Sequence, residues 1–366
     1  MSKKTIRKAA FIIAILSVQL IAFNYTEIKA SGKKPKNIIL FIGDGMGTAQ
    51  VYSAISASET TLFLEKFPYS GFSKTFSANN YITDSAAGGT AIACGTKTNN
   101  GMIGVSPDMT AVSSIIEVAK KNGLATGVLS TSAITHATPA SFVAHNSGRG
   151  NYEEIAKDFL GGTADVFIGG GEDHFRNRSD GADLAVSLRE MGYDVVYSLE
   201  DIKKSESGKV AGLLAKEHMS PASKGRAGVL KEMTNQAIRL LSRNKDGFFL
   251  AIEGSMIDWA CHEKDIDYSI SETLDMDEAI GAALEFAEKD RKTLIVVTAD
   301  HETGGLTLTG GNINNKSVKA EFIESGSHTG VMVPVFSYGP GAARFSGIND
   351  NTFFFNEFIS LLRLRK

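Results

Sequence analysis

Short runs of β-branched and aromatic apolar residues alternate along the chain with segments whose apolar residues recur at helical spacing. The apolar runs predict strands buried on both faces, at residues 37–42, 69–76, 124–129, 165–168, 193–197, 247–252, 294–297 and 331–338. The spaced segments predict helices after residue 47 and at 85–93, 110–122, 152–159, 183–191, 231–242, 268–288 and 353–362. Such alternation predicts an α/β fold, with a mostly parallel central sheet and helices on both of its faces.

Two stretches interrupt this alternation. Residues 199–226 are polar and irregular, and residues 312–325 form a second polar excursion. The 366-residue chain shows no internal repeat and no linker of the kind that separates domains. We therefore expect one large domain over residues 31–366.

The N-terminus has the pattern of a secretion signal. Four basic residues lie within residues 3–8, the apolar stretch 9–23 follows, and Ile28-Lys29-Ala30 offers a cleavage site before Ser31. We expect a signal peptide at residues 1–30 and a secreted or periplasmic mature chain. An uncleaved anchor is the alternative, but the apolar stretch is shorter than the ~20 residues of a spanning helix, so no stable membrane anchor is predicted.

Charge and cysteine content narrow the function only slightly. The net charge is -3 and the chain has no basic tract, so nothing indicates nucleic-acid binding. Cys94 and Cys261 are the two cysteines. Two cysteines make no disulfide framework, and whether they pair stays open at this point.

Several polar residues directly follow predicted strands. Asp44 follows the first strand, Thr138 comes shortly after the third, Glu253 follows the strand at 247–252, and Asp300-His301 follows the strand at 294–297. The carboxyl ends of parallel strands meet at one edge of a sheet, where ligands bind. Acidic groups gathered there would repel one another without cations, and carboxylate and imidazole are common zinc ligands.

Further candidates lie outside the strands. Asp258 and His262 are spaced i, i+4, which places both on one side of a helical turn. Ser85, beside Asp84, begins a helix whose terminus favours an anion. Arg149 lies in a glycine-framed loop and could present its planar fork to phosphate oxygens.

Each of these features alone has an ordinary structural explanation. Asp44 and Ser85 could simply cap helices, Arg149 could be a solvated surface residue, and the i, i+4 pair could be surface partners. The combination is more specific than its parts. Three of the seven histidines, His262, His301 and His328, fall in acidic or glycine-rich contexts, whereas we expect His145, His174 and His218 to be ordinary surface or structural residues.

Six sequence blocks then resemble one family. They are Asp-Gly-Met-Gly from residue 44, Thr-Asp-Ser-Ala-Ala from 83, His-Ala-Thr-Pro-Ala from 136, Glu-Gly-Ser-x-Ile-Asp-Trp-x-x-His from 253, Ala-Asp-His-Glu-Thr-Gly-Gly from 299 and Ser-His-Thr-Gly from 327. In this order they resemble the bacterial alkaline phosphatases, over about residues 37–341, and the chain looks like a compact member. The resemblance implies metal-dependent hydrolysis of phosphate monoesters through a phosphoserine intermediate at neutral to alkaline pH.

The resemblance also implies a role for each matching residue. Ser85 is the expected nucleophile, Arg149 the phosphate clamp and Asp84 the residue that orients it. Two Zn²⁺ and one Mg²⁺ are expected. The ligands of one zinc are Asp258, His262 and His328; those of the other are Asp44, Asp300, His301 and Ser85; those of the magnesium are Asp44, Thr138 and Glu253, with His136 close to it through water.

Two positions vary within the family, and both are expected near the third metal. They are His136, where some members have Asp, and Trp259, where some have Lys or His, so the identity of this metal is open. The family resemblance also favours a homodimer, although the short insertions leave a monomer as an alternative.

The sequence leaves two other functions open. A related metal-dependent phosphodiesterase would share the metal ligands and differ in pocket shape, and an exported phosphate- or zinc-binding protein would lack turnover. A sulfatase is disfavoured, because Ser85 is followed by Ala-Ala-Gly and not by the Cys/Ser-x-Pro-x-Arg pattern.

Overall fold

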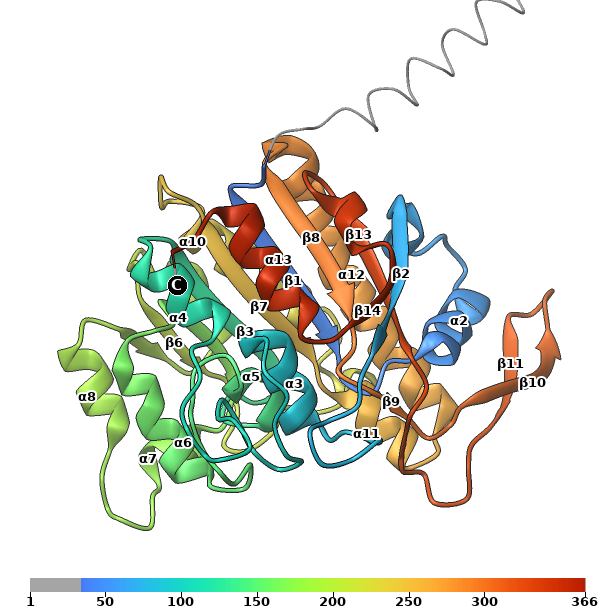
Figure 1. Ribbon diagram of the computed structural model, residues 1–366, viewed down its shortest axis with the longest axis horizontal. Coiled ribbons are helices and arrows are strands. Elements are labelled where there is room, and N and C mark those ends of the chain that lie inside the picture. Colours follow the sequence, from blue (N-terminus) through green and yellow to red (C-terminus); the bar gives the residue numbers. More distant parts are fainter. Residues whose placement is uncertain (1–33, 366) are drawn as a thin grey trace, which may run out of the picture.

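A ten-stranded sheet runs through the middle of the protein (Figure 1). The computed structural model describes residues 34–365, so the predicted signal peptide lies outside the described residues. In spatial order the strands are β14 (Gly347–Asp350), β2 (Tyr69–Lys74), β13 (Val333–Tyr338), β8 (Thr293–Thr298), β1 (Asn37–Gly43), β7 (Phe248–Gly254), β3 (Ala125–Ala133), β4 (Val166–Gly170), β6 (Val210–Leu213) and β5 (Asp194–Val196). Of these ten, β13 alone runs antiparallel to its neighbours. The predicted mostly parallel sheet is confirmed.

Helices cover both faces of this sheet, as predicted. One face carries α3 (Ser85–Cys94), α4 (Ile115–Lys121), α5 (Ala137–Ala140), α6 (Tyr152–Asp158), α7 (Glu172–Arg176), α8 (Leu184–Glu190) and α13 (Phe353–Leu362). The other carries α2 (Thr48–Ala57), α9 (Leu199–Lys204), α10 (Val229–Leu241), α11 (Met256–His262) and α12 (Ile266–Asp290). In Figure 1, α13 and α3 lie in front of the sheet and α12 lies behind it.

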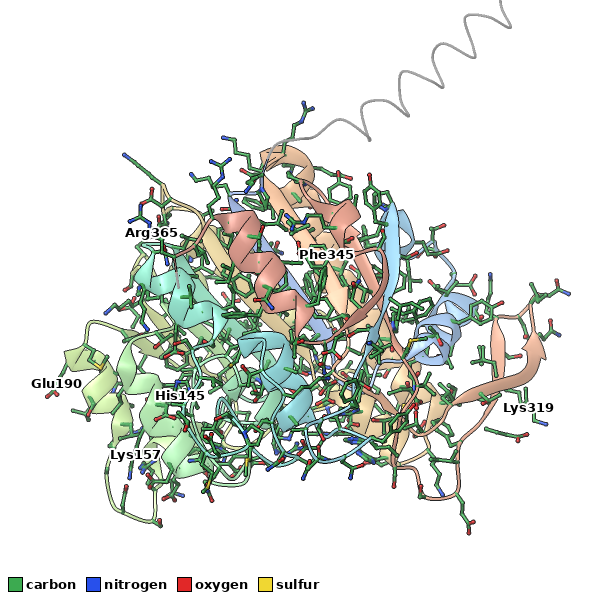
Figure 2. The ribbon with its side chains drawn as sticks, viewed as in Figure 1. His145, Lys157, Glu190, Lys319, Phe345 and Arg365 are labelled. Carbon is green, nitrogen blue, oxygen red and sulfur yellow. The ribbon has the colours of Figure 1, made fainter. Side chains whose placement is uncertain are left out.

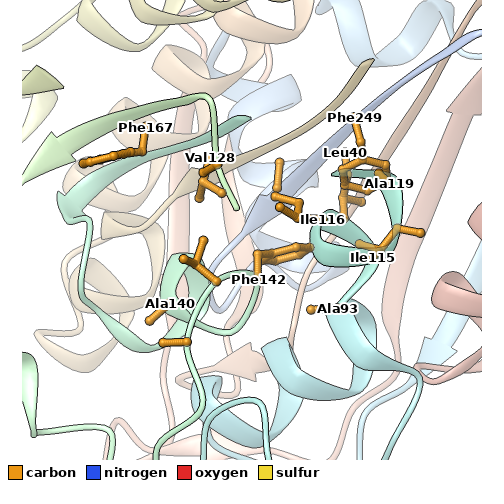
Figure 3. Close-up of a cluster of buried hydrophobic side chains, with 14 of the residues drawn as sticks. Leu40, Ala93, Ile115, Ile116, Ala119, Val128, Ala140, Phe142, Phe167 and Phe249 are labelled. Carbon is orange, nitrogen blue, oxygen red and sulfur yellow. The ribbon is translucent and has the colours of Figure 1, made fainter. Parts of the chain in front are cut away.

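The central strands supply both cores because their side chains alternate between the two faces. In β1, Ile38, Leu40 and Ile42 enter the core on the α3 face, whereas Ile39 and Phe41 enter the core on the α12 face. Figure 3 shows the first core, where side chains of the sheet meet those of α4. This two-sided burial explains why the strands read as continuous apolar runs and not as alternating ones.

Short elements complete the fold outside the large sheet. Two small antiparallel pairs join β9 (Glu302–Thr303) to β12 (His328–Thr329) and β10 (Thr307–Asn312) to β11 (Ser317–Glu321). Four 3₁₀ helices are described, at Phe63–Lys66, Phe159–Gly161, Ala222–Lys224 and Ala342–Phe345. Phe345 is buried, while Lys319, on the β10–β11 hairpin, is exposed at the periphery (Figure 2).

Three predictions about local structure are corrected here. The helix expected at 110–122 begins only at Ile115, because the Ser114 hydroxyl accepts from the Glu117 N–H while the Glu117 carboxylate accepts from the Ser114 N–H. The irregular stretch 199–226 contains α9 and the buried strand β6, and the polar excursion at 312–325 contains β11.

Two further findings concern the cysteines and the membrane. Cys94 and Cys261 are both buried and free, so in the structure they do not pair. Within residues 34–365, no helix combines the length and the apolar character that crossing a bilayer requires.

Candidate active site at the carboxyl edge of the sheet

The register of three parallel strands brings the predicted acidic residues to one place. Gly43 of β1 pairs with Gly254 of β7, and Ile42 of β1 pairs with Thr298 of β8. Asp44, Glu253 and Asp300 therefore emerge side by side, and all three are buried. The structure brings these residues together as the strand order of a parallel sheet requires.

A glycine shapes the first of these strand ends. Gly45 has a φ of 71°, a conformation that side chains disfavour. A Cβ added there would lie 2.8 Å from the Asp258 Cα, so the loop passes directly against α11. This close approach sets Asp44 next to Asp258.

Ser85 faces this edge from the first turn of α3. Its Oγ lies 3.1 Å from His301 Nε2 and 3.5 Å from Asp44 Oδ1. The α3 helix is capped by Asp84, whose side chain accepts from the Ala87 N–H at 3.0 Å. A buried hydroxyl at the positive end of a helix, with nitrogen and oxygen donors around it, is well placed to meet an anionic substrate.

Asp258, His262 and His328 form a first donor group. His262 Nε2 lies 3.3 Å from Asp258 Oδ2 and 3.2 Å from His328 Nε2. The Nδ1 atoms of His262 and His328 lie 2.8 Å from the Gly326 carbonyl and 2.9 Å from the Thr83 carbonyl, respectively. A carbonyl oxygen can only accept, so each ring must carry a proton on Nδ1. In neutral rings the two Nε2 lone pairs then face each other, and a cation between them would relieve this repulsion.

Asp44, Asp258 and His301 form a second donor group, with Asp300 beside it. His301 Nε2 lies 3.3 Å from both Asp44 Oδ1 and Asp300 Oδ2. Asp300 Oδ1 accepts from the N–H groups of Gly45, at 3.3 Å, and His301, at 3.0 Å. Asp300 Oδ2 is buried and accepts no hydrogen bond from the described residues, which leaves it available to a cation.

Asp44, His136 and Glu253 form a third donor group. Glu253 Oε2 accepts from three serine hydroxyls, while its buried Oε1 has no hydrogen-bond partner within residues 34–365. Thr138 Oγ1 lies 3.5 Å from Asp44 Oδ2. The resemblance implied that His136 lies close to this metal through water. A His136 ring nitrogen lies within 4.8 Å of the carboxylate oxygens, a separation that also allows one ion to contact all three residues.

The charges at this edge are unfavourable without cations. Burial, followed by the neighbouring Asp300, Asp258 and Glu253 carboxylates, raises the pKa of Asp44 well above its usual value. Burial, then Asp258 and Glu253, raises the pKa of Asp300 to about 7. Burial also lowers the pKa of His301 well below its usual value, so its 3.3 Å contacts with carboxylates are not charged ion pairs. Neutral imidazoles and crowded carboxylates are the donors that divalent zinc-type ions prefer.

Arg149 approaches the same edge from the loop before α6. Its Nη1 donates to Asp84 Oδ2 at 2.9 Å, and that carboxylate also accepts from the Gly101 N–H at 2.9 Å. Arg149 Nη2 lies 3.5 Å from His136 Nε2. Asp84 thus fixes one side of a guanidinium plane beside the donor groups.

Trp259 and His218 form the aromatic wall of the third group. The Trp259 ring packs edge-on against His136, at 6.1 Å between centroids, and against His218, at 4.7 Å. His218 Nδ1 accepts from the Ala133 N–H at 3.0 Å. The prediction that His218 is an ordinary surface or structural residue missed its place beside the site. The only sequence feature that could have indicated its position is the strand β6 before it. That strand lies in the polar stretch 199–226 and was therefore not recognised.

Thr303 was also missed by the sequence analysis. Its Oγ1 donates to Asp258 Oδ1 and lies 3.2 Å from His301 Nδ1. One hydroxyl therefore touches a member of the first donor group and a member of the second. Thr303 is the fifth residue of the Ala-Asp-His-Glu-Thr-Gly-Gly block, so the block itself pointed to it.

Comparisons with known proteins identify the family and the fold. The family model described as Alkaline phosphatase matches residues 35–322. Alkaline phosphatase 4 of Bacillus subtilis (strain 168) is 33% identical over 426 aligned positions, which cover 92% of this chain and 92% of the relative. The solved alkaline phosphatase of the Antarctic bacterium TAB5 is 42% identical, with a TM-score of 0.87, and covers 91% of this chain and 100% of its own. A variant of that enzyme with Mg bound in its M3 site is 41% identical, with a TM-score of 0.86, over 91% and 99% of the two chains.

Proposed function

The chain belongs to the alkaline phosphatase family and hydrolyses phosphate monoesters, and from that premise we propose that it does so through a phosphoserine formed on Ser85. The observation that carries the proposal is the position of Ser85 Oγ at the start of α3, 3.1 Å from His301 Nε2 and 3.5 Å from Asp44 Oδ1. With the enzyme class established, the alternative of a binding protein without turnover is set aside.

The three donor groups support the predicted metal content. Two Zn²⁺ suit the first group (Asp258, His262, His328) and the second (Asp44, Asp258, His301, with Asp300 and Ser85), which combine imidazole and carboxylate. Mg²⁺ suits the oxygen atoms of the third group, Asp44, Glu253 and Thr138. The imidazole of His136 in this group favours a zinc-type ion and weakens the preference for Mg²⁺.

Bound cations would supply positive charge that favours the ionised form of a nearby hydroxyl and the departing alkoxide. The Ser85 oxygen attacks phosphorus, the bond from phosphorus to the alcohol oxygen breaks, and the alcohol leaves. Water then attacks the phosphoserine and releases inorganic phosphate with Ser85 restored. Arg149 donates to the non-bridging phosphate oxygens throughout, with Asp84 holding its orientation.

The pH range follows from the state of the ligands. Metal ligation requires neutral imidazole. The hydrogen bond with Asp258 raises the pKa of His262, so protons compete for this ligand up to a higher pH than for an ordinary histidine. Activity at neutral to alkaline pH is therefore expected, and acidification should release metal from the first group.

Phosphoserine trapping tests the nucleophile. The enzyme is mixed with ³²P-labelled phosphate monoester at low pH, quenched and digested, and label is expected on the peptide that contains Ser85. Ser85→Ala should abolish the labelling, while Ser141→Ala, which removes another buried hydroxyl close to α3, should retain it. Full labelling of Ser85→Ala would contradict the assignment.

Turnover of an aryl phosphate and of the corresponding bis-aryl phosphate tests the substrate class. The monoester should be strongly preferred, because a clamp on non-bridging oxygens favours a phosphoryl group with three of them. A preference for the diester would support the phosphodiesterase alternative.

Export and dimerisation complete the proposal. The signal-peptide pattern supports secretion or release to the periplasm after cleavage at Ala30, which N-terminal sequencing of the exported protein would test. Tyr81 is 77% exposed and lies against Gly330, next to the exposed Val331 and Met332. This apolar patch supports a homodimer, and sedimentation equilibrium would distinguish it from a monomer.

A further inference from the structure

His174, on the short helix α7, joins three chain segments that lie beside the candidate active site. Its side chain is only 9% exposed. The ring stacks on Tyr152 with 4.7 Å between centroids and an interplanar angle of 28°. Its Nδ1 lies 2.6 Å from Thr135 Oγ1, and its Nε2 lies 3.0 Å from Glu217 Oε2. Both nitrogens and one face of the ring are therefore engaged by separate segments.

Each of these partners is close in sequence to a residue of the site. Thr135 immediately precedes His136, which belongs to the third donor group. Glu217 immediately precedes His218, whose ring packs 5.6 Å from that of His136. Tyr152 begins α6, three residues after Arg149. One imidazole thus connects the segments that carry the anion clamp and the wall of the third group.

The Tyr152 contact matters because Tyr152 adjoins the end of the Arg149 loop, whose other attachments lie at its start, where Asn146 pairs with Ile103, and at Arg149 itself, which pairs with Asp84. Ser147 and Gly150 are exposed, and the Arg149 N–H donates to the Gly101 carbonyl at 2.8 Å. Beyond the loop lies a cavity of about 400 Å³, lined by residues 150–154 and His174. Tyr152 packs against the hydrophobic core, and beside this cavity the stacked His174 restrains its ring further.

The segments that carry Thr135 and Glu217 are themselves firmly held, which makes His174 a fixed support for Tyr152. The segment before His218 is tied to the end of β4, since the N–H groups of Gly171 and Glu172 donate to the Glu217 and Ala215 carbonyls at 2.7 and 2.9 Å. Thr135 lies in the fully buried run that continues β3. A ring bonded to two rigid segments can transmit their position to a third, more exposed one.

We propose that His174 is a positioning residue that holds Tyr152, and through it the Arg149 loop, in the geometry that binds phosphate. The proposal rests on the proposed role of Arg149 as the phosphate clamp. It predicts that loss of the ring weakens the binding of every phosphate-bearing ligand while the nucleophile and its donor groups stay in place.

The test compares His174→Leu, which loses the stack and both hydrogen bonds, with His174→Phe, which keeps an aromatic ring against Tyr152. For His174→Leu, KM and the inhibition constant for inorganic phosphate should both rise about tenfold, with kcat changed less than about twofold, the pattern of lost uniform binding. His174→Phe should recover most of this loss. Unchanged KM and inhibition constant in His174→Leu, or a loss confined to kcat, would overturn the proposal.

A double variant shows whether the effect passes through Arg149. Adding His174→Leu to Arg149→Ala should raise the inhibition constant no further, because coupled residues are not additive. If His174→Leu raised the inhibition constant by the same factor in the wild type and in Arg149→Ala, the positioning role would be overturned. If Arg149→Ala alone leaves phosphate inhibition unchanged, the proposed role of Arg149 as the phosphate clamp fails. If Arg149→Ala weakens inhibition and His174→Leu does not, only the present inference fails.

His145 provides a matched control (Figure 2). Its Nδ1 lies 2.6 Å from the Gly104 carbonyl and its Nε2 3.2 Å from Glu117 Oε1, so it too is bonded through both nitrogens, but to partners outside the site. His145→Leu should lower the melting temperature without changing phosphate inhibition. A matching rise in the inhibition constant of His145→Leu would indicate general loosening and would overturn the specific role of His174.

Discussion

The metal-free protein should become less stable as the pH rises from about 4 to about 7, because of the buried carboxyl of Asp300. Burial, then the charges of Asp258 and Glu253, raises the pKa of Asp300 to about 7 in the folded chain. In the unfolded chain the value is about 3.9. Between these two values the folded state binds more protons than the unfolded state, so stability falls with rising pH.

The size of the effect follows from the two pKa values. Each unit of difference corresponds to about 1.4 kcal/mol, so ionising Asp300 costs the folded, metal-free protein about 4 kcal/mol at pH 8. Between pH 5 and pH 8 the change is about 3 kcal/mol. The raised pKa of Asp44 acts in the same direction. Since total stabilities are about 5–15 kcal/mol, metal-free protein should be markedly weakened at alkaline pH.

Asp300→Asn isolates this contribution. The retained Oδ1 can still accept from the N–H groups of Gly45 and His301, and the atom replaced is Oδ2, which accepts no hydrogen bond from any described residue. Without metal, the variant should therefore be more stable than the wild type at pH 8, by about 4 kcal/mol at most, and the advantage should shrink by about 3 kcal/mol at pH 5. With metal, the order should reverse, because the amide provides no negative charge.

Urea unfolding of chelator-treated protein at pH 5 and pH 8 measures these differences. The wild type, Asp300→Asn and Asp246→Asn are compared, the last removing an exposed carboxylate that lies just before β7, at the opposite end of this strand from Glu253. Asp246→Asn should follow the wild type at both pH values. A stability difference between wild type and Asp300→Asn that is the same at pH 5 and pH 8 would refute the reasoning.

Two further changes should have defined outcomes. His136→Asp replaces the imidazole of the third donor group by an oxygen donor, so Mg²⁺ should bind more tightly relative to Zn²⁺. Metal analysis after dialysis against mixtures of both ions would show this change. An unchanged Zn²⁺ preference would argue against direct contact between His136 and the ion. Arg226→Met leaves the buried carboxylates of Glu272 and Asp275 without the guanidinium that bridges them. The free energy of unfolding, measured with urea, should fall by about 3–5 kcal/mol. A fall below about 1 kcal/mol would mean that the two acids find other partners.

The central strands were readable from the sequence because burial on both faces leaves a continuous apolar run. β1 and β8 are of this kind, and both lie in the middle of the sheet. The strand β6 was missed, since its four residues include a glycine and polar segments flank it on both sides. The order of the strands and the antiparallel direction of β13 depend on long-range pairing, which no local pattern records.

The candidate site was predictable to the extent that it follows strand ends. Asp44 and Asp300 come directly after strands that are neighbours in the sheet, so topology alone brings them together. His218 could not be placed, because its position depends on the unrecognised strand β6 before it. The distance from His136 to its carboxylates was also beyond the sequence, since it depends on how the start of α5 packs against β7.

Two carboxylates link the three donor groups into one unit. Asp258 directs Oδ2 toward His262 in the first group and Oδ1 toward His328, and it also belongs to the second. Asp44 directs Oδ1 toward Ser85 and His301 and Oδ2 toward Thr138 at the third.

A cation in one group therefore neutralises an acid that also belongs to the next group. The same neutralisation removes part of the repulsion that raises the pKa of the other buried carboxyls. Occupancy of the second group should then favour deprotonation of Asp44 for the third, so the ions should load cooperatively and not as independent ligands.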